Sequence, residues 1–179
     1  MINSSFNLPN DISQIKKIAY GGASPTEFSM ILFNDGRLYS AGELCALNQL
    51  GVMYEGHCIF SSRTLVANDV DDIFCGAFHT HYLSRGRLFT FGYNPDGRCG
   101  IDHMEVPTPT EVIDMRDQEI EMLANGRGSA LLLSNGKVYV AGLLLEVAST
   151  KFELLKQLEG HFIVKIVATF YSILALSGK

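Results

Sequence analysis

The stretch "RGRLFTFGYNPDGRCG", residues 85–100, has a strand-like first half and a glycine-rich second half. Its first half resembles "DGRLYSAG" at 35–42 and "NGKVYVAG" at 135–142. The turn glycines of these three stretches are spaced by 50 residues (Gly36, Gly86 and Gly136). A fixed period of this size indicates that the chain is built from repeated supersecondary units. The stretch is therefore a repeat element first and a ligand-binding loop second.

Each copy contains an apolar strand, a break centred on glycine, a second strand, a tight turn and a third strand. The lead-in "VDDIFCG" at 70–76 aligns without a gap with "IEMLANG" at 120–126. The turns of the first and third copies are Asp-Gly and Asn-Gly, the pairs favoured where two-residue hairpins need positive φ. The pair Arg85-Gly86 of the second copy supplies only the glycine, so a longer turn is expected there.

A fourth, more polar strand is expected from "VPTPTEVID" at 106–114, where Pro107 and Pro109 cannot donate to a ladder and favour an edge position. The runs "SALLLS" at 129–134 and "SILALS" at 172–177 are continuously apolar, which indicates strands covered on both faces. Four antiparallel strands with a small, apolar inner strand and a proline-bearing outer strand describe one propeller blade. The sequence therefore predicts an all-β propeller of four-stranded antiparallel blades.

The predicted organisation is a single partial propeller domain over residues 1–179, with about three and a half blades forming a half or partial ring. A content of 47% hydrophobic and 18% charged residues is consistent with an extensive core. The repeats are expected at approximately 15–51, 70–114, 120–160 and, for the partial copy, 163–179.

The expected location is inside the cell, in the cytoplasm or the nucleus, with no membrane partner. The N-terminus lacks the basic start and apolar run of a signal peptide. The longest apolar stretch, "FIVKIVATFYSILAL" at 162–176, is too short for a membrane span and contains Lys165.

No metal, cofactor or catalytic residue is expected. His79 and His81 are two residues apart and face one side of a strand, a geometry that suits a metal, but His79 aligns with serines in the other copies, which favours a structural hydrogen bond. Phosphate-loop, G-x-S-x-G and H-E-x-x-H patterns are absent from the sequence. The cysteines show no C-x-x-C spacing and are expected to be reduced and buried (Cys45, Cys58, Cys75 and Cys99).

The string "CGAFHTHYLSRGRLFTFGYNPDGRCGI", residues 75–101, resembles the repeat of the regulator of chromosome condensation family. The first copy agrees with that repeat in "IKKIAYGG", "DGRLYSAG" and "NQLGV", and the third agrees in "NGKVYVAG". A fourth copy begins as "LEGHFIVKIVATFYSILALSGK". The resemblance covers nearly everything from Ile15 to Lys179.

The resemblance implies a β-propeller that serves as a protein-protein interaction module and binds its partner through rim loops. The alternative that it implies is a guanine-nucleotide exchange factor or regulator of a Ran-type small GTPase. Exchange-competent members use a wedge-like hairpin, whereas the visible insertion here is about five residues, in "GASPTE" at 22–27. The net charge of -5 is unfavourable for phosphate-backbone binding, so nucleic acid is not an expected partner.

The candidate partner-binding residues lie in the second and third copies. Tyr93, Asn94, Asp96 and Arg98 surround a Pro-Gly turn and offer an aromatic anchor with two opposite charges. The alternative is that Asn-Pro-Asp-Gly is only a good turn beside a solvated arginine. Arg127 places a long cation where the second copy has Phe78, and the alternative is that its stem covers apolar surface. The predicted partner-binding residues are therefore Tyr93, Asn94, Asp96, Arg98 and Arg127.

Self-association is the last expectation. A complete propeller of this family has about seven blades and needs on the order of 350 residues, near twice this length. Two blade faces would lack neighbours, lined by Leu32, Phe33, Leu174 and Leu176, while "SSFNLPNDI" at 4–12 resembles an outer strand. A homodimer would close a ring with an even number of blades, and truncation of a longer propeller is the alternative.

Overall fold

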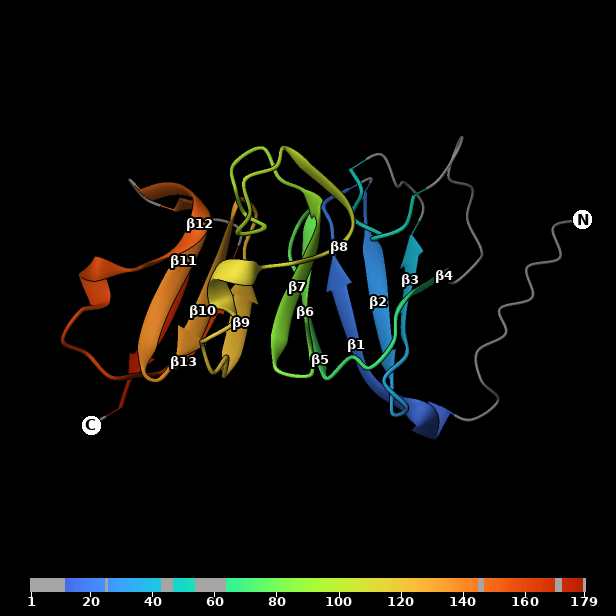
Figure 1. The fold of residues 1–179 in the computed structure, drawn as a ribbon, viewed down its shortest axis with the longest axis horizontal. Coiled ribbons are helices and arrows are strands. Elements are labelled where there is room, and N and C mark those ends of the chain that lie inside the picture. The colour runs from blue at the N-terminus through green and yellow to red at the C-terminus, as the bar shows by residue number, and fades with distance from the viewer. Residues whose placement is uncertain are drawn as a thin grey trace, which may run out of the picture.

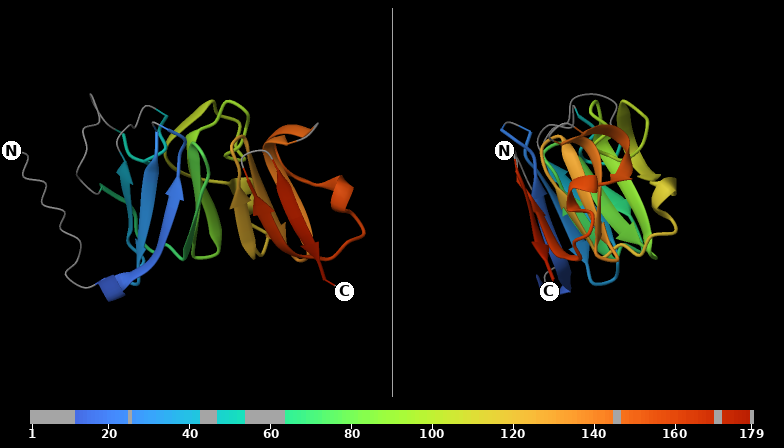
Figure 2. Two further views of the ribbon diagram at one scale, coloured as in Figure 1. Left: turned by 180° about the vertical axis from the view of Figure 1, so that it is seen from behind. Right: turned by 90° about the vertical axis from the view of Figure 1, so that its left-hand side faces the viewer.

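The computed structural model describes residues 12–24, 26–42, 47–53, 64–144, 147–169 and 172–178. Within them the chain forms three four-stranded antiparallel sheets and one two-stranded sheet, which stand side by side in a row (Figures 1 and 2). Three short 3-10 helices, η1 (Ile12–Gln14), η2 (Ile113–Met115) and η3 (Lys156–Leu158), complete the described elements. The strands are β1 (Ile15–Gly21), β2 (Phe28–Phe33), β3 (Leu38–Gly42), β4 (Thr64–Ala67), β5 (Asp72–Cys75), β6 (His79–Ser84), β7 (Arg87–Tyr93), β8 (Glu105–Glu111), β9 (Met122–Asn125), β10 (Ser129–Ser134), β11 (Lys137–Leu144), β12 (Val147–Leu154), β13 (Ile163–Ala168) and β14 (Ile173–Ser177).

Each four-stranded sheet follows the chain in order, which is the arrangement of a propeller blade. Sheet 1 is β1–β4, sheet 2 is β5–β8, sheet 3 is β9–β12, and sheet 4 is β13–β14. The strand β8, with Pro107 and Pro109, lies at an edge as predicted, because neither proline has an N–H to give to a ladder. The predicted partial propeller is confirmed, and its first blade reaches β4, beyond the expected end of the first repeat at 51.

The core consists of layers of side chains between neighbouring sheets. Met30 and Leu32 of sheet 1 pack against Ile73 and Phe91 of sheet 2, and all four are fully buried. A second layer joins sheets 2 and 3, and a third joins sheets 3 and 4. The strand β10 is buried along its whole length because it has a layer on each face, as its uninterrupted apolar sequence predicts.

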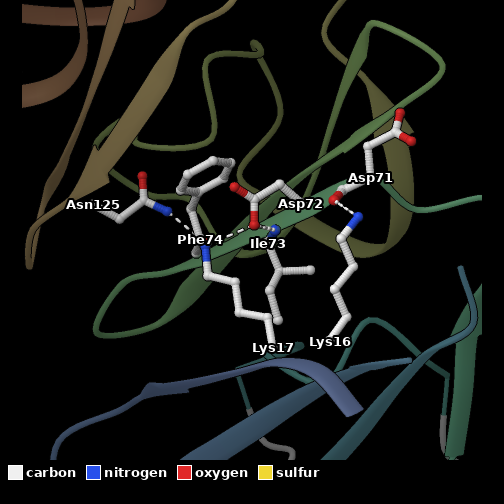
Figure 3. Close-up of polar contacts among 7 residues, drawn as sticks. All are labelled: Lys16, Lys17, Asp71, Asp72, Ile73, Phe74 and Asn125. Atoms are coloured by element: carbon white, nitrogen blue, oxygen red, sulfur yellow. Dashed lines mark hydrogen bonds and ion pairs between the residues drawn. The ribbon is translucent and has the colours of Figure 1, made fainter. Parts of the chain in front are cut away.

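Polar contacts also connect the innermost strands (Figure 3). Lys17 Nζ of β1 lies 2.7 Å from Asp72 Oδ1 of β5 and 4.6 Å from the centre of the Phe74 ring. Lys16 Nζ donates to the Asp71 carbonyl at 2.7 Å, and Asn125 Nδ2 of β9 donates to the Phe74 carbonyl at 2.7 Å. Side-chain hydrogen bonds and an ion pair therefore join the inner strands of neighbouring sheets.

The glycine-centred breaks bring the backbones of successive sheets into direct contact. Gly22 N donates to Gly76 O, and Ala77 N donates to Gly126 O, each at 3.2 Å. A Cβ at Gly21 would lie 2.4 Å from Gly76 O, so a larger residue does not fit there. Because Gly21 is 55 residues before Gly76, and Gly76 is 50 before Gly126, the five extra residues of the first copy lie between β1 and β2.

The hairpin turns differ from the sequence prediction. All three turn glycines have positive φ, at 82°, 73° and 70° (Gly36, Gly86 and Gly136). Arg85 is also left-handed, with a φ of 52°, so the second copy has a two-residue turn and the expectation of a longer one is wrong. In the first copy Phe33 N donates to Arg37 O and Gly36 N donates to Phe33 O, which gives a three-residue loop.

A carboxylate explains which hairpin has the short turn. Asp71 Oδ2 accepts from Arg85 N at 2.6 Å, and Glu121 Oε1 accepts from Asn135 N at 2.6 Å. These two acids hold equivalent positions just before β5 and β9. The equivalent residue of the first copy is Lys16, which cannot accept a hydrogen bond. A carboxylate therefore stabilises a left-handed first turn residue in sheets 2 and 3, whereas Lys16 offers no such acceptor in sheet 1.

The outer faces of the row are apolar and uncovered by described residues. Leu174 and Leu176 of β14 are 66% and 60% exposed, as expected for a face without a neighbour. Leu32 was expected on the opposite outer face, but it points toward sheet 2 and is fully buried. Phe33 is also buried, against the edge of the Tyr39 ring. Ile18 and Tyr20 of β1 occupy the exposed face of sheet 1 instead.

Some sequence predictions lie outside the described residues, namely those on Cys45, Cys58 and most of the segment 4–12. Among the residues that the structure describes, no helix has the length and apolar character that a membrane crossing requires.

Candidate functional site

The glycine-rich loop after β7 is organised by Asn94. This side chain is buried, and its Oδ1 accepts from Cys99 N at 2.7 Å. Its Nδ2 donates to the carbonyls of Ile101 at 2.8 Å and His103 at 2.5 Å. Asn94 therefore fixes the path of the loop from the inside, and only Pro95 and Asp96, both half-buried, reach the surface before the chain turns inward at Gly97.

Arg98 ties this loop to the next sheet. Its guanidinium is buried, with 4% of the residue exposed, and Nη1 donates to the Arg127 carbonyl at 2.6 Å while Nη2 pairs with Asp96 Oδ2. The same group lies 5.9 Å from the centre of the Phe78 ring and 5.6 Å from that of Tyr93. A buried arginine needs such partners because desolvating a charge is costly.

Four of the five predicted residues line one pocket of about 430 Å³ at the loop end of the sheets, opposite the hairpin turns. They are Tyr93, Asp96, Arg98 and Arg127, whereas Asn94 lies beneath the loop. Tyr93 and Asp96 are half-buried, and Arg127 is exposed. Sheets 2, 3 and 4 all contribute to the lining, whose other members are Phe78, Gly128, Ser129, Leu143, Leu144, Thr169, Ser172 and Ile173.

A glycine in the third copy makes the room for this pocket. Tyr93 N donates to Phe78 O at 2.9 Å, and Leu143 N donates to Gly128 O at 2.8 Å, so Gly128 is the equivalent of Phe78. Arg127 is then the equivalent of Ala77, which corrects the alignment of Arg127 with Phe78. A Cβ at Gly128 would lie 3.5 Å from Asp96 Oδ2. The pocket occupies the space that a ring like that of Phe78 would fill in the third copy.

Apart from Arg127, sequence reasoning missed the lining from sheets 3 and 4. The repeat register contains the signal, because residues 76–78 and 126–128, together with Thr169 and Ser172, lie between the first and second strands of their sheets. These segments between the first and second strands are neighbours at the loop end, because the sheets stand side by side. Leu143 follows from the same register, since it takes the place of Tyr93.

A second polar cluster lies deeper, around two histidines of β6. The rings of His79 and His81 are fully buried, edge to face, with centres 5.3 Å apart. His81 Nε2 lies 3.3 Å from Cys99 O, but the described residues offer no well-oriented partner to either nitrogen of His79. The Asn125 side chain is a polar neighbour of both rings, and the predicted structural hydrogen bond of His79 stays a prediction.

The environment of these rings keeps them neutral. Burial, then the His81 ring and the Arg98 charge, hold the pKa of His79 well below its ordinary value. Burial lowers the pKa of His81 to about 4. In the described part of the chain, no three His, Cys, Asp or Glu side chains gather as a metal site. Burial raises the pKa of both Cys75 and Cys99 to about 12, which keeps these thiols unreactive.

Comparison with known proteins identifies the repeat. No family model matches the sequence. An RCC1 repeat-containing protein of Dictyostelium discoideum is 31% identical over 146 residues, which are 72% of this chain and 28% of the relative. The chain belongs to the RCC1-repeat family. The family predicted from the sequence is confirmed.

Solved structures show the same RCC1-type fold. Human WBSCR16 matches with a TM-score of 0.79 and 19% identity over 96% of this chain and 47% of that one. Yeast RCC1 (Prp20), solved with Kap60 bound, matches with a TM-score of 0.75 and 20% identity over 91% of this chain and 41% of that one. Prp20p of Saccharomyces cerevisiae, studied for binding to Gsp1p and histones, also matches with a TM-score of 0.75 and 20% identity, over 93% and 44%. The chain spans less than half the length of each of these relatives.

Proposed function

We propose that this chain is a protein-protein interaction module that binds a protein partner at the loop end of sheets 2, 3 and 4. The observation that carries the proposal is the pocket in which Tyr93, Asp96 and Arg127 surround the buried Arg98. Loops carried by a rigid scaffold are where proteins concentrate binding residues, and tyrosine and arginine are enriched among interface hot spots. RCC1-repeat propellers provide such a scaffold, and this module acts without catalysis of its own, inside the cell.

The proposal predicts that Tyr93→Ala combined with Arg127→Ala weakens partner binding by about tenfold or more. Both side chains reach the surface, so the melting temperature is expected to stay within a few degrees of wild type. Arg98 is unsuitable for this test because it is buried, and its loss would leave Asp96 unpaired. The measurement is capture of partners from the source cell on immobilised protein, followed by calorimetric titration of the captured partner.

The matched control removes two exposed arginines at the hairpin end, Arg37→Ala with Arg85→Ala. These changes remove two positive charges, where the pocket variant removes one, and they leave the pocket intact. Equal loss of binding in both variants would point to charge alone, and unchanged affinity in the Tyr93 and Arg127 variant would reject this surface.

A second candidate function is regulation of a small GTPase. It is favoured by the fold shared with Prp20p, whose structure was studied together with its binding to Gsp1p. The test is release of a fluorescent guanine nucleotide from a panel of Ran-type GTPases with and without the chain. Faster release would support exchange activity. Binding without faster release would support the interaction module, and no binding would reject this candidate.

Self-association through the outer sheet faces is part of the proposal. The strands β13 and β14 expose Val167, Leu174 and Leu176, and β1 exposes Ile18 and Tyr20. Neighbouring sheets elsewhere in the molecule bury equivalent faces in apolar layers, so a second copy would cover these two in the same way.

Accordingly, Leu174→Glu with Leu176→Glu is expected to convert self-associated protein into monomer, because burying two carboxylates in an apolar face is unfavourable. Sedimentation velocity at micromolar concentration measures the change. The matched control is Met104→Glu with Ile113→Glu, which alters exposed apolar residues away from the sheet faces. A wild-type chain that sediments as a folded monomer would contradict the proposal.

A further inference from the structure

The internal repeat indicates which kind of group completes the pocket at the loop end. In sheet 2 the half-buried Phe78 ring packs edge to face against Tyr93, with ring centres 6.4 Å apart. In sheet 3 the equivalent residues are Gly128 and Leu143, so neither place of that pair carries a ring. The pocket therefore contains the place of an aromatic side chain that this chain does not itself supply.

Neither crowding by the described residues nor backbone strain requires a glycine at position 128. Gly128 does not have a left-handed φ, and a Cβ there would meet only ordinary contacts, 3.5 Å from Asp96 Oδ2 and 3.9 Å from Arg98 Nη2. The effect of this glycine is to keep the space beside it open. The pocket volume of about 430 Å³ admits a ring that enters from a second molecule.

The cation beside this space is complementary to the face of a ring. The Arg98 guanidinium already lies 5.9 Å from the centre of the Phe78 ring and 5.6 Å from that of Tyr93. A group placed beside Gly128 would meet the same guanidinium. The face of an aromatic ring is partially negative and attracts a cation, and the attraction is stronger for a desolvated cation such as Arg98, which is 4% exposed.

The remaining wall of the pocket is aliphatic. Leu143 of sheet 3 and Ile173 of sheet 4 line it, and Leu143 is 56% exposed, so apolar surface continues to the mouth. An aliphatic ligand would match this wall but offers no π face to Arg98. An aromatic side chain matches both, because it combines a large apolar area with a ring face.

We propose that this pocket binds an aromatic side chain, phenylalanine or tyrosine, of the partner protein. The ring takes the place in sheet 3 that Phe78 occupies in sheet 2, beside Gly128 and Arg98, and it contacts Leu143 and Ile173. This inference rests on the proposed function and names the chemistry of the partner at the same site.

The test uses three neutral probes and the full, isotopically labelled chain. The probes are the N-acetyl amides of phenylalanine, of cyclohexylalanine, which has a saturated ring of similar shape, and of leucine. The phenylalanine probe is expected to shift the Gly128 and Ser129 amide signals saturably and to cause ring-current shifts of the Leu143 and Ile173 methyl signals. The other two probes are expected to bind more weakly by about threefold or more, because they lack a π face.

Two variants tie the result to the pocket. Gly128→Phe fills the space with the chain's own ring and is expected to abolish binding of the phenylalanine probe. Leu143→Gln removes an apolar contact at an exposed position and is expected to weaken that probe by about threefold or more. The matched control is Thr108→Phe, which adds a ring at an exposed position of β8 and should bind like wild type. A thermal melt shows which variants are folded, and Leu143→Gln decides the question if Gly128→Phe is not.

Equal binding of all three probes, no binding of the phenylalanine probe, or its full binding by the folded pocket variants would overturn the inference. The proposed function fails separately. If partner capture depends on Tyr93 and Arg127 while the phenylalanine probe does not bind, the surface is an interface and the aromatic chemistry is wrong. If the phenylalanine probe binds while partner capture is unchanged in the Tyr93 and Arg127 variant, the pocket accepts a ring but the proposed partner surface is wrong, and the inference fails with it.

Discussion

Replacing Gly142 with alanine is expected to lower the free energy of unfolding by more than about 4 kcal/mol, a large part of the stability of a domain this size. The new Cβ would lie 2.2 Å from Gly128 O, 2.9 Å from Ser129 Cα and 3.0 Å from Arg98 Cα. All three atoms belong to backbone, so no side-chain rotation relieves the clash. Gly142 also has a φ of 88°, which disfavours any residue with a Cβ.

The control is Gly86→Ala. Gly86 has a similar φ of 73°, but a Cβ there meets nothing within 4 Å. Its cost is backbone strain alone, about 1–2 kcal/mol. Urea unfolding followed by circular dichroism compares the two variants. If they lose the same stability, the close approach of the Gly128, Ser129 and Arg98 backbone to Gly142 is wrong.

Acidification is expected to destabilise the protein between about pH 6.5 and pH 4. The unfolded chain protonates His81 near its ordinary pKa of 6.5, whereas the folded chain does so only at about 4. As pH falls through this window, the unfolded state binds the proton first, so the folded state loses stability. At 1.36 kcal/mol for each pKa unit, His81 alone costs about 2–3 kcal/mol by pH 4.5. His79 adds to the loss, because its pKa is also lowered, first by burial and then by the His81 ring and the Arg98 charge.

Unfolding experiments at pH 7 and pH 4.5 measure this effect. A variant with His79→Gln and His81→Gln should lose much less stability on acidification, while His103→Gln with His161→Gln, at two exposed positions, should behave like wild type. Carboxylates such as Glu111 contribute to acid unfolding in every variant, which makes the comparison necessary. Ring signals of His79 and His81 that titrate near pH 6.5 in the folded protein would disprove the assignment.

The fold is readable from the sequence because its repeat is local. The spacing of Gly36, Gly86 and Gly136 fixes the hairpins, and Pro107 and Pro109 place β8 at an edge. Turn length is not readable from the turn residues alone. It depends on a carboxylate at 71 or 121, which lies 14 residues before the turn and reaches it only when the inner strand pairs with its neighbour.

The candidate site is only partly readable from the sequence. Tyr93, Asp96, Arg98 and Arg127 gather in one pocket because successive breaks meet at the loop end. The interior position of Asn94 does not follow from the sequence, since the same Asn-Pro-Asp-Gly letters suit an exposed turn. Nor does the burial of Arg98, which depends on the carbonyl of Arg127 in the next sheet.

The glycine-to-glycine contacts have a consequence for how such a chain diversifies. Gly22 bonds to Gly76 O and Ala77 to Gly126 O through main-chain atoms alone. A duplicated blade therefore inherits this main-chain part of its attachment to the next blade, whatever side chains flank the break. The neighbouring residues Tyr20, Cys75 and Asn125 are chemically unrelated although they occupy the same place in three sheets. Because the contact at the glycine-centred break uses main-chain atoms, that contact is kept when these neighbouring positions change, and new recognition chemistry arises there by point mutation.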